Sequence, residues 1–200
     1  MKYQNIREEE IKNSVATDFF KGFDCDKIVG NIDFAVKVKR TKNAINFDDE
    51  FLLWAESKTG SKDIYAMLTQ LVLTIGKAKT YNEHLPPAFL GCFDGEKIAF
   101  VPYHKIHDIF YQNDFNWNVT SSNTETKEFK QIYDSVKKVV EGEFPWSEKY
   151  KEVYKFDFEK DEKELQKFIK NNFIAGQTET IKLQSTKTIF SRFIKNGVMR

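Results

Sequence analysis

The sequence predicts an α/β protein with a mixed central sheet and helices on both of its faces. Two observations support this class. Segments with apolar residues at helical spacings of three and four alternate with segments rich in β-branched residues. The dipeptide Asp94-Gly95 is a hairpin turn signal between two strand-like segments, which adds a pair of strands to the sheet. This mixture is typical of a sheet covered by helices on both faces.

The elements are predicted in the order helix, strand, strand, helix, hairpin, helix. The first half is predicted to contain a helix over 5–20, a strand over 26–39, a polar loop over 40–50, a strand over 51–58 and a helix over 62–79. The second half is predicted to contain strands over 88–93 and 97–103, a short helix over 104–111, a Ser/Thr/Asn-rich loop near 120–126 and a helix over 127–141.

The composition changes beyond Pro145. The stretch 147–173 is densely charged, thinner in apolar residues and helical in pattern. We therefore expect one domain over 1–145, followed by a helical connector, or the start of a further domain, over 146–200.

Composition excludes several classes of protein. With 200 residues, 40% of them hydrophobic and 19 of them Phe, the chain can bury a substantial core. A net charge of +1 gives no global attraction to nucleic acid. Cys25 and Cys92 lack the CxxC spacing of a zinc or iron–sulfur site. No stretch approaches the roughly 18 apolar residues of a membrane span, and no leader is evident. We expect a cytoplasmic protein with no membrane partner.

Three charged residues, Asp33, Glu56 and Lys58, lie on the two neighbouring predicted strands. A hairpin through the 40–50 loop can place both carboxylates at one edge of the sheet, within reach of one ion. With a backbone carbonyl such as that of Ser57, they make a hard oxygen site suited to Mg²⁺, for which Mn²⁺ can substitute. Lys58 could orient or help to deprotonate a metal-bound water, and could offset charge on the phosphate under attack.

The motif GNIDFAV followed by LLWAESKTG resembles the PD-(D/E)XK nucleases, in particular the G-x-x-D … (D/E)-x-K-T-G pattern of their RecB-like and restriction-endonuclease branches. The resemblance covers about residues 5–100. It implies a restriction-endonuclease-like α/β/α core in which Asp33, Glu56 and Lys58 are catalytic. It also implies that Gln70 is the glutamine found in the helix after the (D/E)-x-K strand.

The first predicted helix begins with three glutamates. The resemblance implies that Glu8, or else Glu9 or Glu10, is a further ligand of the metal or of its water. Thr74 stands where the RecB-like branch has a tyrosine, which counts against an exonuclease of that branch. Three lysines that flank the site are candidates for contact with DNA phosphates: Lys37, Lys62 and Lys77.

These features together predict a Mg²⁺-dependent DNA endonuclease that leaves a 3′-hydroxyl and a 5′-phosphate. The family resemblance favours the cleavage domain of a restriction-modification enzyme, with fused or associated methyltransferase and specificity units. Cutting both strands would call for two active sites, hence a dimer on DNA. Two alternatives stay open: a RecB-like recombination or repair nuclease, and a DNA-binding module with a nuclease fold that does not cleave.

Overall fold

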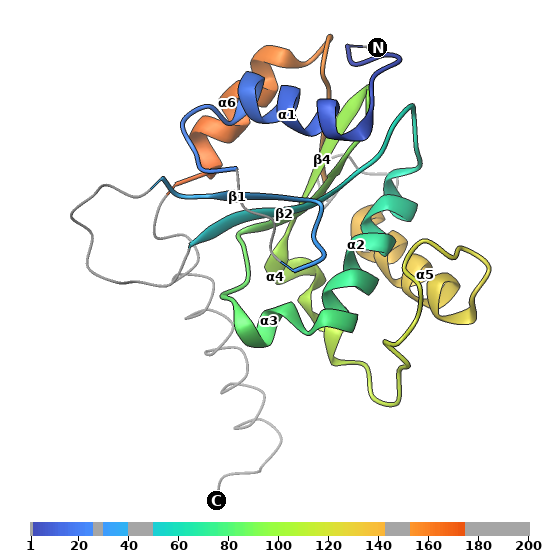
Figure 1. The fold of residues 1–200 in the computed structure, drawn as a ribbon. Coiled ribbons are helices and arrows are strands. Elements are labelled where there is room, and N and C mark those ends of the chain that lie inside the picture. The colour runs from blue at the N-terminus through green and yellow to red at the C-terminus, as the bar shows by residue number, and fades with distance from the viewer. Residues whose placement is uncertain (1, 26–29, 40–49, 143–152, 175–200) are drawn as a thin grey trace, which may run out of the picture.

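The computed structural model describes residues 2–25, 30–39, 50–142 and 153–174, and these form a five-stranded mixed sheet with helices on both faces (Figure 1). The strands follow one another across the sheet in chain order: β1 (Phe34–Lys37), β2 (Phe51–Ser57), β3 (Phe89–Phe93), β4 (Lys97–Pro102) and β5 (Tyr154–Asp157). Neighbouring strands are antiparallel except β2 and β3, which are parallel. The predicted α/β class with a mixed sheet is confirmed.

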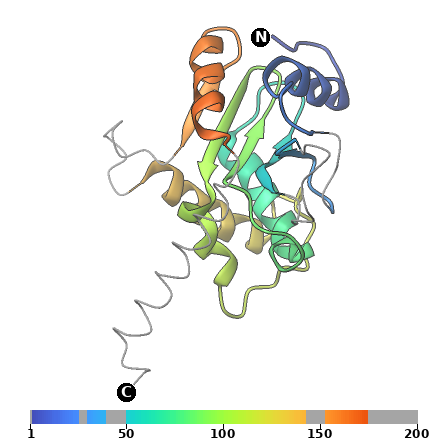
Figure 2. The ribbon, with the colours of Figure 1, turned by 90° about the vertical axis from the view of Figure 1, so that its left-hand side faces the viewer.

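The helices divide between the two faces of the sheet. They are α1 (Glu8–Phe19), α2 (Ile64–Ala78), α3 (Thr80–Glu83), α4 (Tyr103–Ile106), a 3₁₀ helix (His107–Tyr111), α5 (Lys127–Glu141) and α6 (Glu162–Asn172). Figure 1 shows α1 and α6 together above the sheet and α2 and α5 below it. The turned view in Figure 2 shows the same separation. In the described part of the chain, no helix is both long and apolar enough to span a membrane.

Each face of the sheet has its own hydrophobic core. On the α2 side, Leu68 and Leu71 of α2 and Ile132 of α5 pack against Trp54 and Leu90 of the strands. On the opposite side, α1 and α6 cover a core rich in phenylalanine, which includes Phe34, Phe93, Phe100, Phe158 and Phe168. The sheet is therefore buried on both faces, as the near-continuous apolar sequences of β2, β3 and β4 require.

Helix α2 connects the two parallel strands and begins at a well-formed cap. The Asp63 carboxylate accepts hydrogen bonds from the backbone N–H groups of Tyr65 and Ala66, which would otherwise lack partners. The helix ends at Lys79, whose φ of 50° is left-handed. The predicted helix over 62–79 is thus confirmed within two residues, as are the hairpin around Asp94 and the helix over 127–141.

The first predicted strand is too long. Residues 30–33 form a turn in which Gly30 has φ +57°, and β1 covers only four residues. Residues 26–29 lie outside the described residues. Because the chain turns here, Ile32 packs in the α2-side core, whereas a continuous strand would have put it on the same face as Phe34 and Val36, which pack in the opposite core. Asp33 stands at the entrance to the strand.

The helix predicted over 147–173 is wrong at residues 154–157. These residues form β5, which pairs with β4 from Tyr154↔Phe100 to Asp157↔Lys97. Phe158 and Phe168 then join the core beneath α1 and α6. The boundary expected at residue 145 falls in 143–152, outside the described residues, as does 175–200. The described part of this segment completes the sheet and one of its cores.

Candidate active site

A pocket of about 350 Å³ opens where α1, the start of β1, the end of β2 and α2 meet. Its wall includes six of the residues that the sequence singled out: Glu8, Asp33, Glu56, Lys58, Gln70 and Lys77. The other lining residues are Asn31, Thr74, Val119, Thr120, Ser121 and Ser122. Ser57, Lys37 and Lys62 do not line it.

The two carboxylates of the motif meet through strand pairing. Antiparallel register places Phe34 opposite Ala55, so the next residues along, Asp33 and Glu56, come to the same end of the two strands. The backbone N–H of Ser57 donates to Asp33 Oδ2 at 3.4 Å, which ties the Asp33 side chain to β2. Glu56 itself is only 7% exposed. Asp33, although outside the strand, is therefore held beside it.

Lys58 lies between these two carboxylates. Its Nζ is 2.6 Å from Glu56 Oε1 and 3.8 Å from Asp33 Oδ2. Burial lowers the pKa of Lys58, but the surrounding carboxylates, led by Glu56, outweigh it and the pKa lies above its usual value. At neutral pH Lys58 is therefore an ammonium, which is suited to stabilising negative charge on a ligand rather than to accepting a proton as a base.

Glu56 experiences the opposite effect. Burial, followed by the nearby charge of Asp33, raises the pKa of Glu56 to about 6, and the hydrogen bond from Lys58 offsets this only in part. A buried carboxyl with a raised pKa beside other acids is a common feature of functional sites, because a structural role alone seldom justifies its cost.

Glu8 is the first-turn glutamate that faces the pocket. It continues the buried stripe of α1 formed by Ile11 and Val15, and its Oε1 accepts a hydrogen bond from Ser57 Oγ at 3.2 Å. The Glu9 side chain is 72% exposed, and Glu10 Oε2 accepts from the backbone N–H at the start of the helix. Of the three glutamates, Glu8 is therefore the one that lines the pocket.

Lys12 adds a cation that the sequence motifs did not indicate. Its Nζ lies 3.7 Å from Glu8 Oε1 and 3.9 Å from Asp33 Oδ1, and its side chain is 14% exposed. Lys12 and Lys58 thus approach the two different oxygens of the Asp33 carboxylate. The available signal was its position four residues after Glu8, on the same face of the helix.

The segment after Lys58 is bound to the β3–β4 turn at several points. The backbone N–H of Lys58 donates to the Phe93 carbonyl at 3.0 Å, and that of Gly95 donates to the Gly60 carbonyl at 3.1 Å. Gly60 has φ +72°, a conformation that favours glycine. The backbone of Lys58 is therefore held in place by the β3–β4 hairpin as well as by its own strand.

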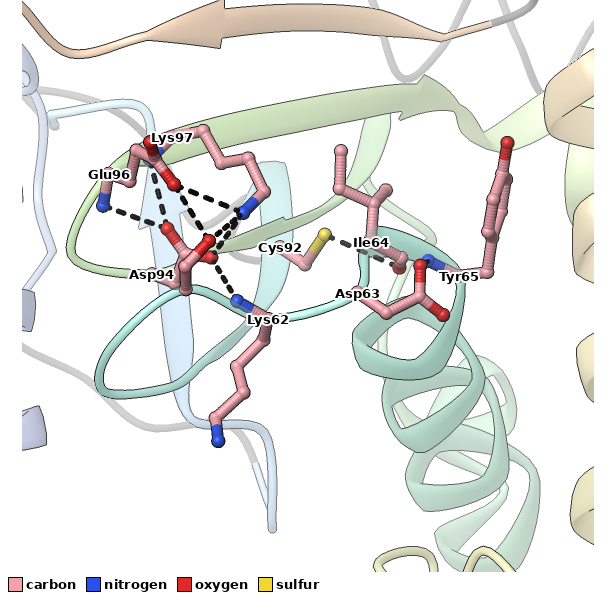
Figure 3. Close-up of polar contacts among 9 residues, drawn as sticks. Lys62, Asp63, Ile64, Tyr65, Cys92, Asp94, Glu96 and Lys97 are labelled. Carbon is pink, nitrogen blue, oxygen red and sulfur yellow. Dashed lines mark hydrogen bonds and ion pairs between the residues drawn. The ribbon is translucent and has the colours of Figure 1, made fainter.

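The fully buried carboxylate of Asp94 completes this connection (Figure 3). Its Oδ2 accepts from the Lys62 backbone N–H at 2.8 Å and from Lys97 Nζ at 2.7 Å. Its Oδ1 accepts from the backbone N–H groups of Glu96 and Lys97 at 2.8 and 3.0 Å. Four donors on one carboxylate make a rigid link between the hairpin and the loop that leads into α2.

The far wall of the pocket consists of α2 and the segment 119–122. Gln70, Thr74 and Lys77 lie at spacings of four and three on one face of α2, which turns them toward the same space. Lys77 Nζ donates to the Val119 carbonyl at 3.2 Å. The Ser/Thr-rich segment had been predicted only as a loop, because nothing in its sequence indicates which helix it packs against.

The remaining predicted residues lie elsewhere. Lys37 is 3% exposed, with its Nζ 5.2 Å from the centre of the Phe51 ring, so in this conformation its ammonium is not presented to a ligand. Lys62 uses its backbone N–H in the link to Asp94, and its side chain extends away from that cluster (Figure 3). Ser57 is fully buried, and its hydroxyl donates a hydrogen bond to Glu8.

The donor set of the pocket suits a hard divalent cation. Glu8, Asp33 and Glu56 offer carboxylate oxygens, the ligands that Mg²⁺ and Mn²⁺ prefer. Within the residues described, however, no group of three or more His, Cys, Asp or Glu side chains is close enough together to hold a metal ion. The ammonium of Lys58 lies between two of the acids. The donor atoms of the site therefore suit a cation, but in this conformation the carboxylates are not arranged around a single point.

Comparisons of the chain with protein-family models, with curated proteins and with solved structures gave no match. The geometry of the pocket and the motifs that line it are therefore the grounds for assigning a function.

Proposed function

We propose that this chain is a Mg²⁺-dependent DNA endonuclease of the PD-(D/E)XK class with a restriction-endonuclease-like fold, the cleavage domain of a restriction-modification enzyme. One observation carries the proposal: the acidic residues and the lysine of the motif, from two strands, and a glutamate from the first helix line a single pocket. The elements that carry these residues support it too, since α1, β1, β2 and α2 follow one another within residues 5–100, the stretch on which the resemblance rests.

The residues divide the chemistry between them. Asp33 and Glu56, with Glu8 beside them, would hold the cation, which when bound supplies an activated water and neutralises the phosphate. Lys58, protonated and adjacent to both acids, stabilises negative charge that develops on the phosphate oxygens. Gln70, on the opposite wall, is placed to hydrogen bond to the water or to the phosphate. Because the Lys58 ammonium lies close to both Glu56 and Asp33, a cation held by these carboxylates would compete with it for their oxygens.

Cleavage of covalently closed plasmid DNA tests the proposal. We expect nicking or linearisation with Mg²⁺ or Mn²⁺, no product with EDTA, and a loss of at least about 100-fold in rate for Lys58→Ala, the size typical of removing one group that stabilises transition-state charge. Lys163→Ala, an exposed lysine on α6, is the control and should cleave like the wild type.

The same substrate separates the alternatives. A nuclease that needs a strand end would degrade linear DNA and leave the closed circle intact. A module that binds without cleaving would retard DNA on a gel but give no product with any divalent ion. Equal cleavage by wild type and Lys58→Ala would remove Lys58 from the mechanism and with it the proposed class.

A further inference from the structure

The pocket has two chemically unlike ends. Glu8, Asp33 and Glu56 occupy one of them, with Lys58 among them. Apart from these four and Lys77, the lining is uncharged and, with Val119 as the exception, consists of residues with an amide or a hydroxyl: Asn31, Gln70, Thr74, Thr120, Ser121 and Ser122. Lys77 is the cation on that side. Carboxylates repel a phosphate chain, whereas hydroxyls and a lysine attract it, so a bound polyanion has one favourable wall to follow.

The segment that carries the hydroxyls is held in place by packing. The Trp117 ring lies directly on Gly76 of α2, so close that a Cβ at position 76 would be 2.0 Å from the ring. Trp117 also contacts the rings of Phe110 and Phe115. Two residues later, the Val119 carbonyl accepts the bond from Lys77. The hydroxyls are thus presented by a wall fixed to α2, which lowers the entropy lost when a ligand binds.

We propose that Thr120, Ser121 and Ser122, with Lys77, form a backbone-binding subsite for the nucleic acid strand next to the phosphodiester that is cleaved. The inference rests on the proposed function, because it takes the carboxylate end as the place of cleavage. Short hydroxyl side chains suit phosphate and sugar oxygens, contacts that position a strand without reading its bases. The subsite therefore contributes affinity and register, and no sequence preference.

Binding in the absence of cleavage tests this directly. A fluorescent DNA duplex is titrated by anisotropy with the cleavage-impaired Glu56→Gln protein in Mg²⁺, over a series of salt concentrations. On that background, Thr120→Val/Ser121→Ala/Ser122→Ala should raise Kd about 10-fold with the slope of log Kd against log salt unchanged, because neutral hydrogen bonds are lost and no ion pair is. Lys77→Ala should weaken binding and reduce the slope by about one.

Thr124→Val is the matched control, since Thr124 is an exposed hydroxyl in the same loop that does not line the pocket. In the cleaving protein the triple variant should raise KM with kcat unchanged.

A triple variant that matches Thr124→Val in Kd and KM, or that lowers kcat alone, overturns the subsite. If wild type cleaves and the triple variant binds normally, only this subsite fails. If wild type does not cleave and the Glu56→Gln protein does not bind DNA, the proposed function itself fails. Circular dichroism of each variant shows whether the fold is retained.

Discussion

Glu56 is held in surroundings that oppose its charge. Its folded-state pKa is about 6, above the ordinary value of 4.5, because it is buried beside Asp33. For a carboxyl whose pKa is raised by folding, the folded state binds the proton more tightly. The contribution of protonated Glu56 to the free energy of unfolding is therefore fully present below about pH 4.5 and is lost as pH rises through 6. Above pH 6 the ionised group costs about 2 kcal/mol.

This cost predicts that Glu56→Gln stabilises the metal-free protein at pH 7. In EDTA we expect the free energy of unfolding to rise by roughly 1–2 kcal/mol, and the advantage to shrink toward pH 4.5 as wild-type Glu56 becomes protonated. Urea denaturation at several pH values measures it. Glu164→Gln, at an exposed position on α6, should change little. A Gln variant less stable than wild type at pH 7 would show that the pair with Lys58 outweighs burial.

Individual site residues were predictable where a short local rule applies. Alternation along β2 and the antiparallel partner strand bring Glu56 and Asp33 together, and helix periodicity selects Glu8 over its neighbours. Lys12 follows the same periodicity and was overlooked. The burial of Lys37 beside Phe51 was not predictable, because alternation gives the face of the strand but does not show whether a helix or ring covers that face.

At the scale of elements, the link between the β3–β4 turn and the loop after Lys58 predicts a dual effect of Asp94→Asn. An amide cannot receive all four donors that the carboxylate accepts, and Lys97 loses its charged partner. We expect a loss of about 1.5–3 kcal/mol in unfolding free energy and a fall in kcat, as the loop and Lys58 shift. Thermal unfolding and cleavage assays give the two readouts.

Asp157→Asn is the matched control for Asp94. Asp157 also accepts two backbone N–H groups in a turn, those of Glu159 and Lys160, but it lies in the β5–α6 turn rather than in the one linked to Lys58. It should lower stability less and leave cleavage intact. If both variants reduced cleavage equally, the fall would reflect stability in general and not the position of Lys58.

The contact between α2 and the segment after Trp117 predicts an unusual outcome for a helix substitution. Alanine normally stabilises a helix by about 1 kcal/mol relative to glycine. At Gly76, however, the added Cβ would overlap the Trp117 ring, so Gly76→Ala should destabilise the protein. In the double variant Gly76→Ala/Trp117→Ala the overlap is gone, and the alanine in the helix should cost nothing or stabilise. Unfolding free energies from the four proteins of this cycle measure the coupling, and additive effects would contradict the packing.

Elements were predictable wherever local signals and packing agree. Helix α2 has a cap, an apolar stripe and a left-handed end, and its prediction was accurate. The 26–39 strand was overextended because β-branched residues continue through the turn at Gly30. The sequence of residues 154–157 does not indicate a strand, because their strand character comes from pairing with β4, a contact with a partner about 55 residues away in sequence.

For the molecule as a whole, β5 and α6 close one of its two cores. The rings of Phe168 and Phe173 contact Phe89 and Phe100 of the central strands, and Phe158 lies against Phe19 of α1. These side chains are far along the sequence from the motif, yet they bury the face of the sheet on which α1, and with it Glu8, rests. The position of Glu8 in the pocket thus depends on residues beyond 153.

This dependence predicts that a chain ending at residue 145 does not fold cooperatively. Deletion removes several buried phenylalanines, each of which contributes about 3–5 kcal/mol, from a protein whose total stability is expected to be about 5–15 kcal/mol. It also leaves β4 as an unpaired edge that can associate with other chains. We expect a broad urea transition, binding of a hydrophobic dye and no cleavage. Phe168→Ala in the full chain should instead lose about 3–5 kcal/mol while unfolding in a single sharp transition. A truncated chain that unfolds as sharply as the full one and still cleaves would mean that the α2-side core is enough to hold α1 and the site together.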